Sequence, residues 1–180
     1  SRHKNKATVA LDFHVDNAPL HADFLTDSYT VAQGKTFHLK IKANKQVKTA
    51  TITVGSKSFP AYPESATSTI YECFIPIDCE ERIGETPLIA QLTDATTNSV
   101  TLNHTLAVQE FVFRKGRMHI DAQQKLEEEK DISNQQQILT DAIVQWMEKS
   151  QPNKLWTGAF EFPIQVQQII TPHGEIRMTP

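Results

Sequence analysis

Glycine and cysteine are both scarce in this chain, whose 180 residues include six glycines and two cysteines. Two cysteines are too few for a structural zinc site built from three or four thiolates. So few glycines leave little material for a loop that cradles a phosphate, and no P-loop, dinucleotide-binding or G-x-S-x-G motif is present. The sequence therefore gives no support to nucleotide-binding enzymes or to serine hydrolases of that type.

Long apolar runs and an excess of basic charge are also missing. No run approaches the ~18 apolar residues of a membrane span, and no signal-peptide core is present. The formal net charge is −3, and basic residues concentrate at the N-terminus, at Arg2, His3, Lys4 and Lys6. Nucleic acids and anionic lipid surfaces need a basic partner, so we expect no nucleic-acid partner and no membrane span in this chain. A mature exported protein would have the same composition.

The two cysteines lie in the run YECFIPIDC, at Cys73 and Cys79. If this run is extended at ~3.3 Å per residue, their Cα atoms are about 20 Å apart, whereas a disulfide allows at most about 7 Å. We therefore expect two free thiols. A catalytic role for either thiol is disfavoured, because both sit in a strand-like run that contains no basic residue to favour the thiolate.

Apolar and polar residues alternate in short runs through the first two thirds of the chain, which is the period of half-buried strands. In KTFHLKIKA, for example, Phe37, Leu39 and Ile41 share one face. Strands are predicted at residues 8–15, 35–43, 49–54, 69–77, 88–92 and 99–108, and turns at residues 33–34, 55–57, 84–87 and 94–99. With no helical period before residue 120, this pattern predicts a mainly β fold: an antiparallel β-sandwich of roughly seven strands with immunoglobulin-like architecture.

The period changes after Arg117. Residues 121–149 contain neither glycine nor proline and are rich in Gln, Glu and Lys, which predicts a helix. Ser133 and Gln136 have the spacing of a capping box, which places the helix start at Ser133. An apolar stripe at helical spacing consists of Ile138, Leu139, Ala142, Ile143, Trp146 and Met147. We expect this stripe to pack on the strands or on residues 156–163, and a helix that binds a partner or dimerises is the alternative.

Histidine and carboxylate residues occur near one another at several places, but none has the spacing of a standard metal motif. The groups considered are His14 with Asp12 and Asp16, His21 with Asp23, His104, and the acidic run Glu127–Glu129. We interpret the first two groups as solvent-facing strand residues and the acidic run as a solvated face. His104 falls on the inward face of its strand, where one hydrogen-bond partner is the commoner role. No catalytic, cofactor-binding or metal-binding residue is therefore assigned in this chain.

The stretch KLWTGAFEFPIQVQQIITPHGEIR, residues 154–177, is aromatic and rich in turn residues. Its pattern is too irregular for an amphipathic helix and predicts two strands, each entering a turn. A W-x-G-x-F-x-x-P segment is present at Trp156, Gly158, Phe160 and Pro163, and a second segment matches at Ile170, Thr171, Pro172, Gly174 and Arg177, with His173 at a usually aromatic position. In these segments the chain resembles the opening of the catalytic domain of M23-family (LytM-type) zinc peptidases, which cut peptidoglycan peptides.

The resemblance implies a zinc-dependent enzyme of the bacterial cell envelope, periplasmic or extracellular. The zinc ligands of that family come from an H-x-G-x-D motif and a later H-x-H motif, and this chain contains neither. We therefore expect a β-sandwich domain at residues 1–117, a helical linker at 118–153 and the truncated start of a catalytic β domain at 154–180. The chain as a whole is expected to be a non-catalytic regulatory or positioning region. Its partner would be peptidoglycan or the parent's own catalytic domain, with zinc bound only in the full-length parent.

A weaker resemblance concerns the strands. The Q-G-K-T-F run at residues 33–37 and the strands that follow are similar to the sandwich domain that precedes some M23 catalytic domains. The alternative function is a β-sandwich binding or scaffold protein of the envelope, which includes an inactive relative of the peptidases that kept the binding scaffold.

Overall fold

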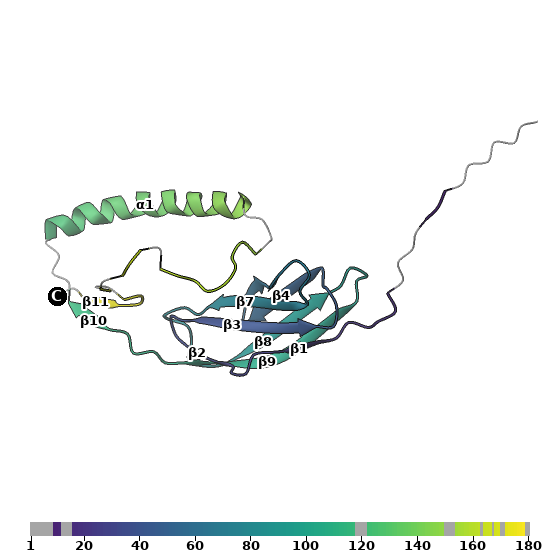
Figure 1. Cartoon of the computed structure of the whole chain (residues 1–180). Helices are drawn as coiled ribbons and strands as arrows, with labels where there is room; N and C mark the ends of the chain where they lie inside the picture. Colours follow the sequence, from purple (N-terminus) through teal and green to yellow (C-terminus); the bar gives the residue numbers. More distant parts are fainter. Residues whose placement is uncertain are drawn as a thin grey trace, which may run out of the picture.

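The described part of the chain contains eleven strands, from 2 to 11 residues long, and one helix (Figure 1). The structure is a computed structural model, and it describes residues 9–11, 16–117, 122–149, 154–162, 164–166, 168–169 and 172–178. The strands are β1 (Ala22–Phe24), β2 (Thr30–Ala32), β3 (Thr36–Ala43), β4 (Thr49–Val54), β5 (Lys57–Pro60), β6 (Tyr62–Pro63), β7 (Ile70–Pro76), β8 (Gly84–Thr93), β9 (Ser99–Gln109), β10 (Lys115–Arg117) and β11 (Ile176–Met178). The helix, α1, is Ala122–Lys149.

Nine of the strands form two sheets, one in the order β1-β3-β7-β6 and the other in the order β2-β9-β8-β4-β5. Every pair in these sheets is antiparallel except β2 with β9. In β3, Phe37, Leu39 and Ile41 are buried while Thr36 and His38 are exposed, as the alternation of side chains across a strand requires. The prediction of a mainly β fold with antiparallel sheets is confirmed.

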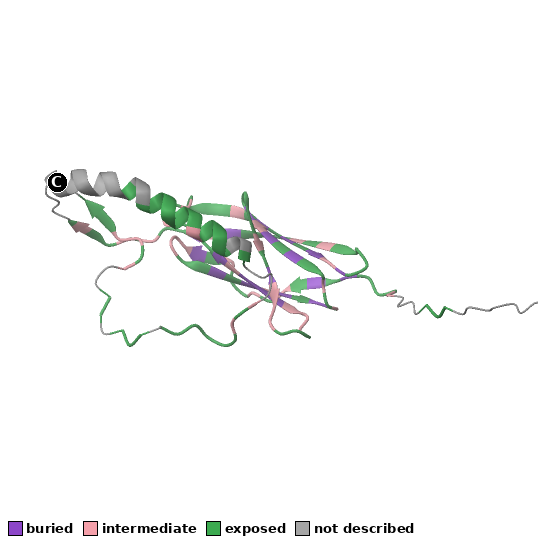
Figure 2. Ribbon diagram, turned by 90° about the horizontal axis from the view of Figure 1, so that it is seen from above, coloured by how far each residue is buried: buried purple, intermediate pink, exposed green. Residues whose placement is uncertain are grey.

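The buried residues of the two sheets belong to one apolar cluster. Its largest fully buried apolar side chains are Leu39, Ile41, Ile52, Ile75, Leu88, Leu92 and Leu106. Each side chain of this size stabilises the fold by about 1.5–3 kcal/mol when it is fully buried. Figure 2 shows the buried residues concentrated in these strands, so the stability of the chain comes mainly from this region.

Five of the six predicted strands are present, as β3, β4, β7, β8 and β9. The predicted turn at Gly84 and Pro87 is wrong, because both residues lie in β8. Pro87 is tolerated there since β4 pairs with β8 only from Leu88 onward, which leaves this end of β8 at a sheet edge. The expected number of roughly seven strands is too low, because β1, β2 and β6 are too short to show an alternation in the sequence.

The strand predicted at residues 8–15 is absent where the structure describes this stretch. Val9 and Leu11 belong to no strand and are exposed. Residue 8 and residues 12–15 lie outside the described residues. Alternation was not sufficient here, because a strand also needs a neighbour that satisfies its backbone hydrogen bonds.

Helix α1 begins earlier than the capping-box spacing predicts. It runs from Ala122 to Lys149, so Ser133 lies inside the helix and does not start it. The residues before Ser133 are themselves good helix formers. A capping box marks a start only where the preceding residues leave the helix.

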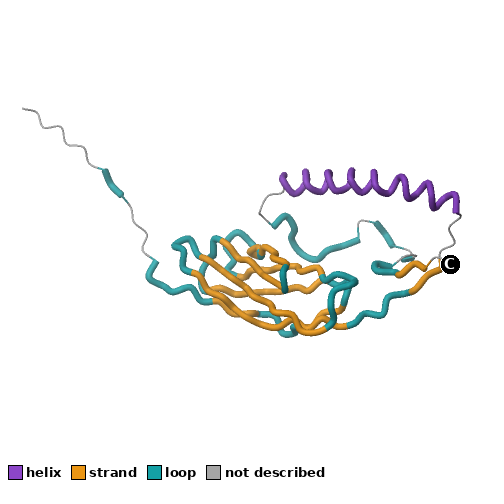
Figure 3. Tube along the Cα trace, turned by 180° about the vertical axis from the view of Figure 1, so that it is seen from behind, coloured by secondary structure: helices purple, strands orange, loops and turns teal. Residues whose placement is uncertain are grey.

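The apolar stripe of α1 is not covered, so the predicted packing is wrong for the side chains that the structure describes. Ile138, Leu139, Ile143 and Trp146 are all exposed, Trp146 by 66%. Met147 has a side chain outside the described set. In Figures 1 and 3 the helix lies apart from the two sheets, and the segment after it runs back along it. Within the part of the chain that the structure describes, no helix combines the length and the apolar character needed to cross a bilayer.

The stretch after the helix differs from the two predicted strands. Residues 154–162 form no strand, so the first of these predictions is wrong there, and residues 163, 167, 170 and 171 lie outside the described residues. The turn at His173 and Gly174 is confirmed, and Gly174 has the positive φ of 78° that favours glycine. β11 follows the turn and pairs in parallel with β10, with Gly116 opposite Arg177.

Candidate functional site

Strands β3 and β7 place polar and aromatic side chains on the outer face of the four-stranded sheet. His38 of β3 lies opposite Phe74 of β7, and Lys40 lies opposite Glu72. These four positions alternate with the core residues of the same strands, so their side chains point away from the core. The segment 154–160, which follows α1, lies against this face through the contacts below.

Glu72 is buried, with an exposed fraction of 6%, although it is on the outer face. One carboxylate oxygen accepts a hydrogen bond from Lys154 Nζ, and the other lies 3.0 Å from His38 Nε2. Burial alone raises the pKa of Glu72, but the hydrogen bonds to Lys154 and His38 outweigh it and hold the pKa below its ordinary value. The carboxylate therefore stays charged, and it ties the chain at residue 154 to β7.

Aromatic contacts extend this attachment. The ring centroids of Trp156 and Phe160 lie 5.8 and 5.7 Å from that of Phe74, both in edge-to-face arrangements. Such pairs add about 0.5–1.5 kcal/mol beyond the burial of their area. Two residues of the W-x-G-x-F segment thus pack on the sheet. We call Glu72, Phe74, Lys154, Trp156 and Phe160 the β7 docking site.

A second attachment lies at the other end of the C-terminal segment. Glu175 accepts from Arg114 Nε at 2.9 Å, and the backbone N–H of Ile176 donates to the Arg114 carbonyl at 2.9 Å. Gly174 approaches the ring of Phe113 so closely that an added Cβ would lie 2.3 Å from it. His173 Nε2 is 3.4 Å from the sulfur of Cys79. We call these contacts, together with the β10–β11 pair, the β10 docking site.

The contact of Cys79 is one that sequence reasoning missed. Both cysteines are free, as predicted: Cys73 is buried, and burial raises the pKa of its thiol to about 12, while Cys79 is half-buried. The run that contains Cys79 has no histidine, but the fold brings His173 to it from 94 residues away. A separation of this length leaves no local pattern that could have signalled the contact.

The β7 docking site also lines a hollow on the surface of the four-stranded sheet. Two adjoining hollows, of about 480 and 450 Å³, share His38, Phe74, Trp156 and Phe160. The first also contains the ion pair of Lys40 with Glu64, whose N–O distance is 2.6 Å. Volumes of this size fall within the range of about 300–1,000 Å³ that is typical of small-molecule sites. We call the two hollows together the β7 groove.

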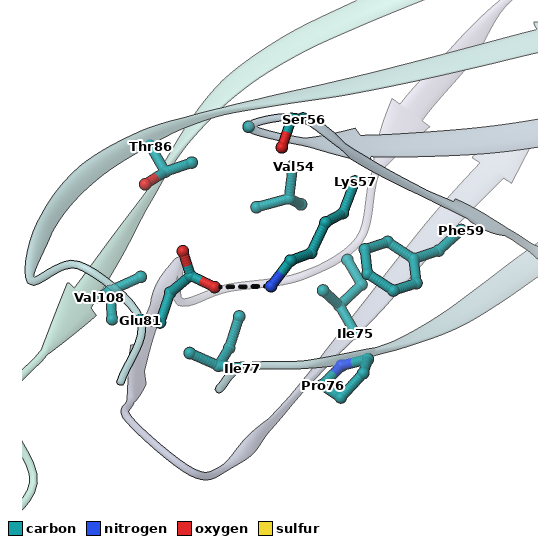
Figure 4. A pocket seen from close by; sticks show the side chains of 11 residues that line it. Val54, Ser56, Lys57, Phe59, Ile75, Pro76, Ile77, Glu81, Thr86 and Val108 are labelled. Carbon is teal, nitrogen blue, oxygen red and sulfur yellow. Dashed lines mark hydrogen bonds and ion pairs between the residues drawn. The ribbon is translucent and has the colours of Figure 1, made fainter. Parts of the chain in front are cut away.

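A much smaller cavity lies where the β4–β5 turn meets the end of β7 (Figure 4). Its volume is about 50 Å³, and its walls include Val54, Phe59 and Ile75. Lys57 Nζ and the Glu81 carboxylate, 3.0 Å apart, form an ion pair beside it. The cavity is far below the ~300 Å³ of small-molecule sites, so it is not a candidate for ligand binding.

The histidines and carboxylates considered above do not gather. Among the residues that the structure describes, no three His, Cys, Asp or Glu side chains form a group that could hold a metal. Asp16 pairs with Lys45, whose Nζ also lies 2.7 Å from the buried Asp94. His104 lies opposite the buried Leu88, on the inward face of β9 as expected, although its side chain is exposed. Its ring stacks on Tyr29 at a centroid distance of 3.5 Å, and its Nδ1 accepts a hydrogen bond from the backbone N–H of Thr105 at 2.8 Å. Residues 12 and 14 and the side chains of 127–129 lie outside the described set.

No protein-family model and no curated protein matches the chain.

Proposed function

We propose that this chain is the non-catalytic front region of a peptidoglycan-cleaving zinc metalloendopeptidase, and that it positions the catalytic domain that opens at residue 154. The two sheets with their shared core are, in this proposal, an immunoglobulin-like sandwich, and the protein acts in the bacterial cell envelope. The observation that carries the proposal is the packing of Trp156 and Phe160, residues of the M23-like segment, on Phe74 of β7.

The two docking sites explain how the region would position a catalytic domain. The β7 docking site holds the beginning of the C-terminal segment and the β10 docking site holds its end. Each combines aromatic or glycine contacts with an ion pair whose carboxylate is nearly inaccessible to solvent. A domain that continues from this segment would take its orientation from the sheets, because contacts at two separated points restrict rotation as well as distance.

The zinc chemistry of the proposal is not assigned to this chain. The described residues provide no three-ligand group, and the sequence contains neither histidine motif of the family. A metal-bound water that attacks a peptide bond would therefore belong to the catalytic domain. The contribution of residues 1–153 would be to orient that domain or to cover its substrate groove.

The test is hydrolysis of purified peptidoglycan by the protein that carries this chain together with the residues that follow Pro180. We expect release of cross-link peptides that a chelator stops, and a several-fold change in rate when residues 1–150 are removed. The sequence after Pro180 should contain H-x-G-x-D and H-x-H. A continuation without these motifs, combined with no release of peptides, would refute the proposal.

The alternative is an envelope binding or scaffold protein, and the exposed stripe of α1 favours it. Ile138, Leu139, Ile143 and Trp146 form an uncovered apolar surface on one helix, and uncovered apolar surface is characteristic of interaction sites. Binding of an envelope partner that the change Trp146→Asp abolishes, with no peptide release by the longer protein, would support this alternative over the first.

A further inference from the structure

The β7 groove has walls of two kinds, and together they restrict what it binds. One wall is aromatic: the ring of His38 stacks on Phe74 at 4.3 Å, and Trp156 and Phe160 stand beside them. Phe160 is 71% exposed in spite of its apolar ring. A flat apolar surface of a ligand that covered this ring would remove its contact with water, which is favourable.

The other wall is charged, but its charges are already paired. Lys40 is bonded to Glu64, and Glu72 is shared by Lys154 and His38. The positive charges of the two lysines and the negative charges of the two glutamates cancel. An ionic ligand would have to displace one of these partners and leave the other charge without compensation, which is most costly at Glu72 and Lys154, whose side chains are only 7% and 13% exposed. The groove therefore favours a neutral ligand.

Paired charges still have hydrogen-bonding capacity left. A lysine ammonium has three N–H donors and a carboxylate has about four acceptor positions, so each pair can bind hydroxyl or amide groups without breaking. Hydrogen bonds to charged groups are also about twice as strong as those between neutral groups. The groove thus combines an aromatic surface with fixed donors and acceptors at its side.

We infer that the β7 groove binds a neutral saccharide of N-acetylhexosamine units, which in the setting of the proposed function is the glycan strand of peptidoglycan. A pyranose ring has one face of C–H groups, which suits an aromatic ring, and a rim of hydroxyl and acetamido groups, which suits the charged wall. The two adjoining hollows, about 480 and 450 Å³, correspond to two consecutive sugar units. The identification of the saccharide as the glycan strand of peptidoglycan rests on the proposed function, whereas the binding of an N-acetylhexosamine saccharide does not.

The experiment is a fluorescence titration of the 180-residue chain with chitotetraose. A Trp146→Phe background leaves Trp156 as the one tryptophan, since the chain has two, and Trp156 lines both hollows. We expect saturable binding that strengthens from N-acetylglucosamine to chitobiose and then changes little. Because the ligand is neutral, the dissociation constant should stay within about twofold between about 50 and about 500 mM NaCl.

Two phenylalanines give a matched pair of variants. Phe160 and Phe162 are 71% and 73% exposed, but Phe160 lines both hollows and Phe162 lines neither. Phe160→Ala should weaken binding about five- to tenfold, the effect of losing one aromatic contact, while Phe162→Ala should leave it unchanged. Thermal melts of both variants should match the parent, because neither ring belongs to the buried cluster.

Three results would overturn the inference: no saturable change up to about 10 mM chitotetraose, equal effects of the two alanine variants, or binding of a stem tetrapeptide in place of the saccharide. The inference and the proposed function fail separately. If the longer protein releases peptides but this chain binds no saccharide, the proposed peptidase function stands and saccharide binding in the β7 groove is refuted. If the chain binds the saccharide but the longer protein releases no peptides, saccharide binding stands and the proposed function is refuted.

Discussion

Replacing Lys154 with methionine removes the cation beside Glu72 while it keeps an unbranched side chain of similar length. Removing one partner of a buried ion pair typically costs about 3–5 kcal/mol. The cost here should be lower, because Glu72 keeps its 3.0 Å contact with His38 and the groove beside it admits water. With side chains 7% and 13% exposed for Glu72 and Lys154, we expect about 1–3 kcal/mol, which lowers the ratio of docked to undocked segment by about 5- to 150-fold.

This loss should be local. Residues 154–160 contribute no side chain to the buried cluster of the two sheets, so the global unfolding midpoint should move little. The measurement is hydrogen exchange and Trp156 fluorescence in a Trp146→Phe background. Both should report a freed segment, while the amides of β3, β7 and β8 keep their protection.

Lys57→Met is the matched control, because Lys57 also pairs with a glutamate, Glu81, but with side chains 54% and 34% exposed. An exposed pair contributes about 0–1 kcal/mol, so this change should leave the segment docked. If Lys154→Met also leaves the emission of Trp156 and the exchange of residues 154–160 unchanged, the ion pair does not hold the segment and the reasoning is wrong.

Three further predictions follow from the same contacts. The pKa of Glu72 in the docked state is lowered from 4.5, so the charged carboxylate should stabilise docking fully above about pH 4.5, and this stabilisation should be lost as the pH falls through the lowered pKa. In a pH titration of tryptophan emission, Glu72→Gln should flatten this dependence. A thiol reagent should modify Cys79 in the native protein but Cys73 only in denaturant, because burial raises the pKa of Cys73 to about 12; mass spectrometry should therefore find one adduct before unfolding and two after it. Gly174→Ala should release β11 from β10, because its φ is positive and the new Cβ would lie 2.3 Å from a ring; the exchange rate of the Ile176 amide, which donates to the Arg114 carbonyl, measures this release. Gly84→Ala is the control at another positive φ, with nothing within 4 Å of the new Cβ, and since Gly84 lies in β8 it should leave the exchange of the Ile176 amide unchanged.

The sequence determined the local elements that depend on a period. Alternation located β3, β4 and β7, because a half-buried strand must place every second side chain in the core. Composition located the helix but not its start, because capping spacing has meaning only beside a real helix end. Alternation failed at Val9 and Leu11, where the described residues show no strand.

The tertiary structure decided everything that joins distant parts of the chain. The pairing of Glu72 with Lys154 spans 82 residues and that of Cys79 with His173 spans 94. Neither separation is reflected in any local pattern, since these contacts depend on the path that the whole chain takes. The stripe of α1 shows the converse: its helical spacing predicted burial, but whether a face is covered depends on what packs beside it. Here its described large apolar residues, Ile138, Leu139, Ile143 and Trp146, remain exposed.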